Sequence, residues 1–118
     1  MVKILVIEDD EAVRFALMVA LQSMGHDVEF ACNGEEGIEK CQEKTFELVI
    51  TDLIMPQKDG LETTADLKRK WPDIKVILMS GGGKGIDTQE VALNSGATAF
   101  LSKPFTAREL EDCIVFSL

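Results

Sequence analysis

The chain has 118 residues, 46% of them hydrophobic, and a formal net charge of −9 at pH 7. This length is typical of one compact domain with its own core, so residues 1–118 are predicted to form a single domain. The acidic balance disfavours direct binding to nucleic acid or to an anionic membrane surface, because like charges repel. The only basic run, residues 68–70, suits the last turn of a helix.

Nothing in the sequence directs the chain to a membrane or to an oxidising compartment. The longest uncharged stretch, residues 15–26, is too short to span a bilayer and has the apolar period of a helix. Cys32, Cys41 and Cys113 lack metal-ligand spacing and are predicted to be buried thiols. No signal-like apolar region follows the first residue, so a reducing cytoplasm is expected.

Short apolar runs alternate with segments of helical period in the first half of the chain. Residues 4–7 predict a buried strand, and the apolar spacing from Val13 to Met24 predicts the helix after it. Gly25 suits the end of that helix. Residues 26–31 predict a strand at a sheet edge, and residues 34–41 predict a weaker helix.

The second half continues the same alternation. Strands are predicted at residues 48–50, 76–79 and 99–101. Asp59 suits the start of a helix that stops near residues 71–72, and Gly96 suits the end of another helix. Thr106 and Glu109 form a capping box, which predicts the start of the last helix. Five strands alternating with five helices predict an α/β fold, namely a flavodoxin-like doubly wound (βα)5 arrangement. Its parallel five-stranded sheet is expected in the strand order 2-1-3-4-5.

Charged or hydroxyl side chains follow four of the predicted strands. They are Glu8 and Asp9 after the first, Asp52 after the third, Ser80 after the fourth and Lys103 after the fifth. Residues just past the carboxyl ends of central strands converge on one crevice, so these five side chains are expected to meet. Each close pair of carboxylates would repel by roughly 4 kcal/mol at about 4 Å and an effective dielectric near 20.

A divalent cation would offset this repulsion. Lys103 can neutralise one carboxylate, which leaves a charge of about −2 in the crevice. Mg²⁺ favours oxygen ligands and keeps open positions for phosphate oxygens. Asp52 follows a central strand and is the best placed carboxylate to accept a phosphoryl group, with Lys103 neutralising developing charge and Ser80 donating a hydrogen bond.

The same residues carry a family resemblance that spans nearly the whole chain. The motifs are ILVIEDD at residues 4–10, TDLIMP at 51–56 with DG at 59–60, MS at 79–80 and KPF at 103–105. Each motif alone is weak, but four in this order, each behind a buried strand, are specific. The chain closely resembles the receiver domains of bacterial response regulators.

The resemblance implies a role for each crevice residue. Asp52 would be the phosphorylation site, Asp9 a direct metal ligand, Glu8 a ligand through water and the Ile54 carbonyl a backbone ligand. Asp10 is left out of the metal site, and Asp9 or Asp10 could instead cap the first helix.

The resemblance also implies a switch. The Lys103–Pro104 peptide bond would be cis, the Ser80 hydroxyl would turn toward the phosphoryl group and the Phe100 ring would rotate inward. Without the resemblance, Phe100 is more simply a core residue. The glycine-rich residues 81–85 predict a change of order on phosphorylation at residues 81–86. Ile54 and Gly82 occupy the positions that tune phosphoryl lifetime, which stays undecided.

The expected partners follow from the family. A histidine kinase or a histidine phosphotransfer protein would donate the phosphoryl group, docking near the first helix and the crevice. The fourth helix, fifth strand and fifth helix, roughly residues 87–116, would contact an effector domain or a second receiver, including a homodimer formed on phosphorylation. The domain would be a phosphoacceptor in signalling and no enzyme beyond its own phosphorylation and dephosphorylation.

The sequence lacks features that four other functions would require. A phosphohydrolase shares the chemical groups, but its acidic pair would follow the first strand and its substrate would need an enclosing insertion. The glycine run has neither the spacing of a Walker A motif nor that of a GxGxxG motif, the two common nucleotide-binding patterns. A flavin site would need hydroxyl groups where Glu8 and Asp9 stand. A module that only associates would be expected to have lost one of the five crevice residues.

Overall fold

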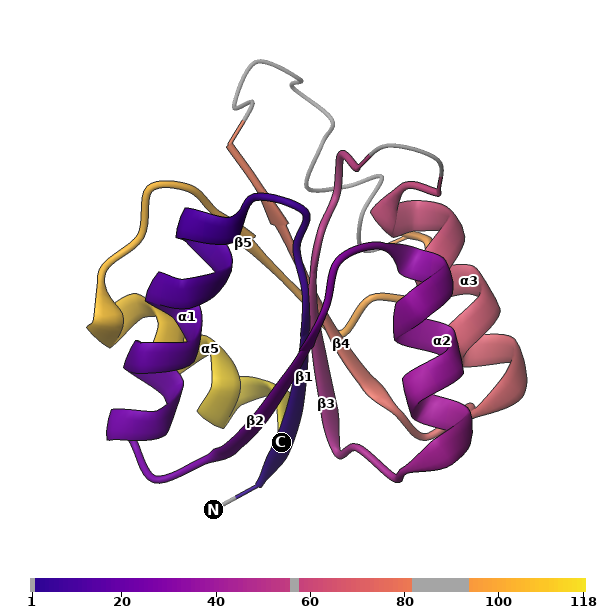
Figure 1. Ribbon diagram of the computed structural model, residues 1–118, viewed down its shortest axis with the longest axis horizontal. Helices are drawn as coiled ribbons and strands as arrows, with labels where there is room; N and C mark the ends of the chain where they lie inside the picture. Colours follow the sequence, from indigo (N-terminus) through magenta and orange to yellow (C-terminus); the bar gives the residue numbers. More distant parts are fainter. Residues whose placement is uncertain (1, 56–57, 82–93) are drawn as a thin grey trace.

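The computed structural model of the chain describes residues 2–55, 58–81 and 94–118. Its strands form one five-stranded parallel sheet in the order β2-β1-β3-β4-β5 (Figure 1). The strands are β1 (Lys3–Ile7), β2 (Asp27–Ala31), β3 (Leu48–Asp52), β4 (Lys75–Ser80) and β5 (Ala99–Ser102). The predicted doubly wound α/β fold and its strand order are therefore confirmed.

Among the described residues, three helices connect consecutive strands and a fourth follows the last strand. They are α1 (Glu11–Ser23), α2 (Gly34–Glu43), α3 (Gly60–Lys70) and α5 (Ala107–Ser117). The helix predicted before the last strand falls largely on residues 82–93, which lie outside the described residues, as does most of the glycine-rich segment expected to change order. No helix in the described ranges is both long enough and apolar enough to cross a bilayer.

Side-chain caps decide where the helices begin. The Asp10 carboxylate accepts hydrogen bonds from the backbone N–H groups of Ala12 and Val13, so α1 starts earlier than the apolar period indicates. Asp59 accepts from the N–H of Glu62, and Thr106 forms its predicted capping box. Gly25 follows α1 with a φ angle of 93°, and Gly96 precedes β5 with a φ angle of 104°; a side chain would be strained at either position.

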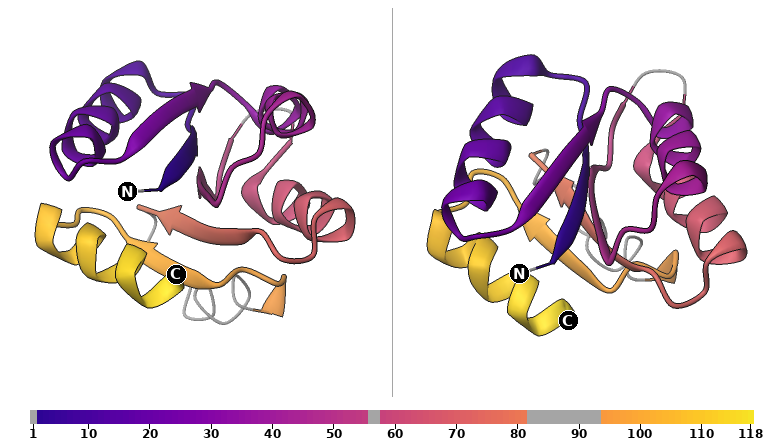
Figure 2. Two further views of the ribbon diagram at one scale, coloured as in Figure 1. Left: turned by 90° about the horizontal axis from the view of Figure 1, so that it is seen from below. Right: turned by 60° about the horizontal axis from the view of Figure 1, so that its bottom comes forward.

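Two helical layers cover the sheet. Helices α1 and α5 lie on one face, and α2 and α3 lie on the other (Figures 1 and 2). Each face has its own apolar cluster, because neighbouring side chains of a strand point to opposite faces: Ile4 and Val6 of β1 belong to one cluster, Leu5 and Ile7 to the other. All four are fully buried, as expected for a strand covered on both sides.

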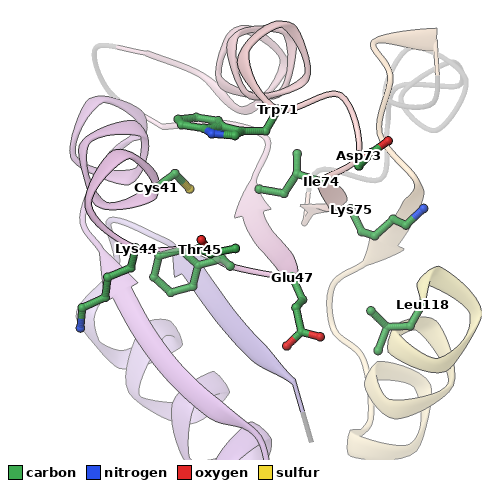
Figure 3. A pocket seen from close by; sticks show the side chains of 10 residues that line it. Cys41, Lys44, Thr45, Glu47, Trp71, Asp73, Ile74, Lys75 and Leu118 are labelled. Atoms are coloured by element: carbon green, nitrogen blue, oxygen red, sulfur yellow. The ribbon is translucent and has the colours of Figure 1, made fainter.

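A cavity of about 420 Å³ opens at the amino ends of the strands, and we call it the base cavity. Figure 3 shows its lining side chains, which come from the ends of α2, α3 and α5 and the starts of β3 and β4. They include Trp71, the only tryptophan of the chain, and Cys41. Burial raises the pKa of the Cys41 thiol to about 11.

The cysteines differ in burial. Cys41 is buried and Cys113 is partly buried, but Cys32 is exposed, so the prediction of a buried thiol was wrong at that position. Cys32 follows the last residue of β2, where the backbone N–H of Cys32 is bound by the Glu36 carboxylate at 2.7 Å. It lies in the turn before α2, on the surface where connecting segments run.

Candidate functional site

Three carboxylates gather at the carboxyl ends of β1 and β3. Glu8 and Asp9 directly follow β1, and Asp52 is the last residue of β3. One carboxylate oxygen of each residue lies within 4.8 Å of those of the other two. These three residues, called the acidic cluster below, are the carboxylates that were expected to meet.

The sheet topology brings the cluster together. Strand β1 pairs with β3 in parallel, and Ile7 lies opposite Thr51 in their register. An acidic residue follows each member of that pair, Glu8 in one chain segment and Asp52 in the other, and the two strands end within one residue of each other. Figure 1 shows both ends at the same rim, opposite the rim that holds the two chain termini.

Lys103 joins the acidic cluster from the end of β5. Its Nζ atom lies 3.1 Å from Oε1 of Glu8 and 3.5 Å from Oδ1 of Asp52. The backbone N–H of Lys103 donates to the Ser80 carbonyl at 2.8 Å, which extends the pairing of β4 with β5 by one step. The following peptide bond, Lys103–Pro104, is cis. One cation therefore bridges two of the three carboxylates.

Glu8 has the most perturbed environment in the cluster. Its side chain is only 1% exposed, and burial raises the pKa of this carboxyl above its ordinary value. The backbone N–H of Asp10 and the Lys103 ammonium oppose this rise by stabilising the charged form, whereas Asp52 adds to it. A buried, charged Glu8 therefore depends on the cations and donors around it.

Ser80, Phe100 and Ile54 lie around the cluster in different settings. Ser80 ends β4 and is 4% exposed, one strand away from Asp52. Phe100 of β5 is partly buried and packs in a small apolar cluster with Leu78. Ile54 follows β3 by two residues, and its side chain is 72% exposed.

The start of α3 is held closely against the carboxyl end of β3. The N–H of Gly60, the first residue of α3, donates to the Leu53 carbonyl at 2.7 Å. A Cβ atom added at Gly60 would collide with the Asp52 carbonyl oxygen and crowd Leu53. A glycine is needed there because α3 starts in direct contact with the backbone of Asp52.

The sequence patterns did not reveal Arg14. This residue of α1 donates from Nη1 to the carbonyl oxygen of Glu8 at 2.9 Å, and its guanidinium lies over the Phe30 ring. Arg14 is six residues from Glu8 and belongs to no motif. Only the three-dimensional course of the turn between β1 and α1 brings it to the site.

The donor atoms of the acidic cluster suit a hard cation. The three side chains offer only carboxylate oxygens, which Mg²⁺ prefers, and no thiolate or imidazole takes part in the cluster. Two of the three carboxylates are already neighbours of Lys103. An added divalent cation would balance the negative charge of the carboxylates that Lys103 does not neutralise.

The described residues therefore form a doubly wound parallel sheet with an acidic cluster and a lysine at its carboxyl-end rim. The family model of the response regulator receiver domain matches residues 4–115. The chain therefore belongs to the receiver domains of response regulators, the family of two-component signalling in which phosphorylation and Mg²⁺ binding are typical.

Relatives of known name agree with this family. The chain is 38% identical over 110 residues to the transcriptional regulatory protein ZraR of Klebsiella oxytoca, and this match covers 93% of the chain but 25% of that protein. It is 36% identical to the response regulator receiver protein CpdR of Brucella abortus, with 93% of the chain and 91% of that protein covered. Against the first relatives, the chain spans about a quarter to a half of their length.

Solved structures share the whole fold. A receiver domain protein of Clostridium thermocellum matches with a TM-score of 0.92 at 31% identity, covering 99% of this chain and 94% of that one. The chemotaxis protein CheY4 of Vibrio cholerae matches with a TM-score of 0.92 at 26% identity, covering 100% of this chain and 99% of that one. The similarity extends over all the described elements.

Proposed function

We propose that residues 1–118 form one phosphoacceptor receiver domain, which takes a phosphoryl group from a phosphohistidine donor onto Asp52 in the presence of Mg²⁺. The observation that supports this most strongly is the acidic cluster with Lys103 bridging Glu8 and Asp52 at 3.1 and 3.5 Å. The donor would be a histidine kinase or a histidine phosphotransfer protein of the cytoplasm.

In the transfer, Asp52 is the nucleophile. One of its carboxylate oxygens forms a bond to phosphorus as the bond from phosphorus to the donor's imidazole nitrogen breaks, and the freed imidazole takes up a proton. The Lys103 ammonium, already 3.5 Å from Asp52, moves to a phosphoryl oxygen and neutralises charge there. The Ser80 hydroxyl donates a hydrogen bond to another phosphoryl oxygen.

The acidic cluster supplies the metal ligands. Asp9 and Asp52 would hold the ion directly, Glu8 would hold it through a water molecule, and the Ile54 carbonyl would be a backbone ligand. When bound, Mg²⁺ neutralises the negative charge of the carboxylates and of the incoming phosphoryl group. Without it, the phosphoryl group would approach three acidic residues, two of which form ion pairs with Lys103.

Phosphorylation then changes the output surface. The phosphoryl group adds about −1.5 to −2 charge and three acceptor oxygens, which draw the Ser80 hydroxyl inward and leave space for Phe100 to rotate. The surface of α4, β5 and α5, where α4 is the helix expected within residues 87–95, contacts an effector domain or a second receiver, which includes a homodimer of phosphorylated chains. The domain acts as a signalling phosphoacceptor, with no reaction beyond its own phosphorylation and dephosphorylation.

Intact mass spectrometry after incubation with Mg²⁺ and a small phosphodonor tests this function. The parent chain is expected to gain the mass of one phosphate, and Asp52→Asn to gain none, because an amide is no nucleophile toward phosphorus. Asp73→Asn is the matched control, since it changes the same group at the other end of the sheet, and it should gain one phosphate. A gain in Asp52→Asn would show that the acceptor is another residue.

A further inference from the structure

Arg14 makes two contacts that connect α1 to the acidic cluster. Its Nη1 atom donates to the carbonyl oxygen of Glu8 at 2.9 Å. The centre of its guanidinium lies 4.7 Å from the centre of the Phe30 ring in β2, close enough for a favourable cation–π contact. The hydrogen bond thus ends on the backbone of the cluster, and the ring fixes where the guanidinium can lie.

The carbonyl that Arg14 binds belongs to the peptide group between Glu8 and Asp9. A peptide group is planar, so holding its oxygen also fixes the direction in which the chain enters Asp9. The N–H of Glu8 is held too, by the Ala31 carbonyl of β2 at 3.1 Å. Phe30 and Ala31 are neighbours in β2. The same strand therefore holds the N–H of Glu8 directly and its carbonyl oxygen through Arg14.

The side chain of Glu8 is held at its far end as well. Its Oε2 atom accepts from the N–H of Asp10 at 3.1 Å, and its Oε1 atom accepts from Lys103 at 3.1 Å. These contacts place the carboxylate of Glu8, and neither of them is made to the oxygen of the following peptide group. Among the hydrogen bonds of the described residues, the bond from Arg14 is the one that restrains this peptide oxygen.

We propose that Arg14 is a positioning residue of the metal site, which fixes the Glu8–Asp9 peptide group so that the Asp9 carboxylate faces Asp52. This inference rests on the proposed function, because it assumes that the acidic cluster binds Mg²⁺. Arg14 touches neither the ion nor the phosphoryl group. It acts through the peptide group that leads into Asp9, the proposed direct ligand.

A purely electrostatic role for Arg14 predicts the opposite effect. A guanidinium near the cluster repels a cation, so its removal would strengthen Mg²⁺ binding if charge alone mattered. Loss of positioning weakens Mg²⁺ binding instead, because Asp9 must then be ordered when the ion binds. The sign of the change in affinity therefore separates the two roles.

Isothermal titration calorimetry with Mg²⁺ alone, on the whole chain, measures this sign. Arg14→Gln is expected to weaken Mg²⁺ binding about tenfold, a typical effect of residues that orient metal ligands. Arg14→Lys keeps a long cationic donor and should recover most of the affinity. Lys40→Gln is the matched control, because Lys40 also lies over the Phe30 ring, at 5.3 Å, and carries the same charge. It should bind Mg²⁺ at least as tightly as the parent.

Phe30→Leu provides a second variant in case Arg14→Gln does not fold. It removes the ring beside the guanidinium while leaving the hydrogen bond donor in place, and a two- to fivefold loss of Mg²⁺ affinity is expected, roughly the value of an exposed cation–π contact. Circular dichroism establishes that each variant is folded. Unchanged affinity in a folded Phe30→Leu would contradict the inference.

The outcomes distinguish the inference from the proposed function. If the parent chain binds no Mg²⁺, the proposed function fails and the role of Arg14 fails with it. If the parent binds Mg²⁺ and takes up phosphate on Asp52, but a folded Arg14→Gln binds the ion equally well or more tightly, only the role of Arg14 is overturned.

Discussion

Glu8 combines nearly complete burial with a charge that the site needs. Its side chain is 1% exposed, and two hydrogen bonds to its carboxylate, from Lys103 and from the backbone of Asp10, oppose the rise in pKa that burial causes. A buried carboxylate that loses such partners costs more than the bonds contributed while they were present. The stability of the metal-free domain should therefore depend on Lys103.

We expect Lys103→Met to destabilise the metal-free chain and to make it more responsive to Mg²⁺. Without the ammonium, Glu8 and Asp52 repel each other in a buried setting, which should lower the free energy of unfolding by about 1 to 3 kcal/mol in EDTA. Mg²⁺ should restore most of this loss, because the ion replaces the missing positive charge. Urea denaturation followed by circular dichroism, with EDTA and with Mg²⁺, measures both effects.

The control for this prediction is Lys75→Met, which removes a lysine at the opposite end of the sheet. Its effect on stability should be the same with and without Mg²⁺. An equal response of the two variants to the ion would contradict the proposed placement of Lys103 in the metal site.

The residues of the acidic cluster could be predicted from sequence because each lies at the carboxyl end of a strand or just beyond it. A buried apolar run fixes where a strand ends, and the parallel sheet brings those ends to one rim. Arg14 could not be predicted in this way. Its contacts depend on how the chain turns between β1 and α1 and on Phe30 of another strand, and neither leaves a pattern in the sequence.

At the scale of elements, α3 is tied to the loop that follows Asp52. Lys58 in that loop forms an ion pair with Asp66 of α3, and Arg69 pairs with the same carboxylate at 2.5 Å. The hydrogen bond from Lys58, followed by that from Arg69, holds the pKa of Asp66 below its ordinary value. The first pair joins the residue before the N-cap of α3 to the middle of the helix, and the second joins that middle to the last turn.

We expect Asp66→Asn to lower stability at neutral pH but not in acid. Because the pKa of Asp66 is lower in the folded chain than in the unfolded chain, its contribution is complete above the unfolded value of 3.8 and disappears as the pH falls through the folded value. The loss at pH 7 should be roughly 0.5 to 1 kcal/mol, since the pair is partly exposed. Urea denaturation at several pH values measures it.

The parent and Asp66→Asn should reach the same stability once the pH lies below the folded pKa of Asp66. Asp73→Asn serves as the control, because it removes a carboxylate from the turn between α3 and β4. A loss in Asp66→Asn that persisted unchanged in acid would assign the effect to packing instead of charge.

Helix boundaries could be predicted less well than strands. The apolar period from Val13 to Met24 gave the buried side of α1, but Asp10 sets its first turn through hydrogen bonds to the backbone. Of the two residues that could cap this helix, Asp9 and Asp10, it is Asp10 that does so. The exposed Cys32 was missed for a related reason, since composition indicates how often a residue type is buried and not where a turn runs.

At the scale of the whole molecule, the strand order could be predicted because few connections are allowed. Short right-handed crossovers between parallel strands leave a small number of arrangements, and β1 beside β3 is common to the doubly wound one. This central pair is also what joins the ligands after β1 to the acceptor at the end of β3. Predicting this strand order therefore also predicted that the acidic residues meet.

Binding of Mg²⁺ at this central pair should stabilise the entire domain. An ion present at 100 times its dissociation constant adds about 2.7 kcal/mol to the free energy of unfolding if it binds only the folded chain. Differential scanning calorimetry should show this gain in the parent and a much smaller one in Asp9→Asn. Asp10→Asn should keep the full gain, because an asparagine still caps α1 and Asp10 lies outside the acidic cluster.

If both asparagine variants lose the gain in stability on adding Mg²⁺, the ion depends on the total negative charge at the rim and not on one ligand. Loss in neither would mean that it binds elsewhere. Either result would count against Asp9 as a direct ligand.

Trp71 provides an intrinsic fluorescence signal, but it lies far from the acidic cluster. The indole lines the base cavity at the amino ends of the strands, and the acidic cluster lies at their carboxyl ends. Its fluorescence should report whether the sheet is intact, yet an ion arriving at the far rim does not touch it. Any change in emission on phosphorylation would therefore have to be relayed along the length of the strands.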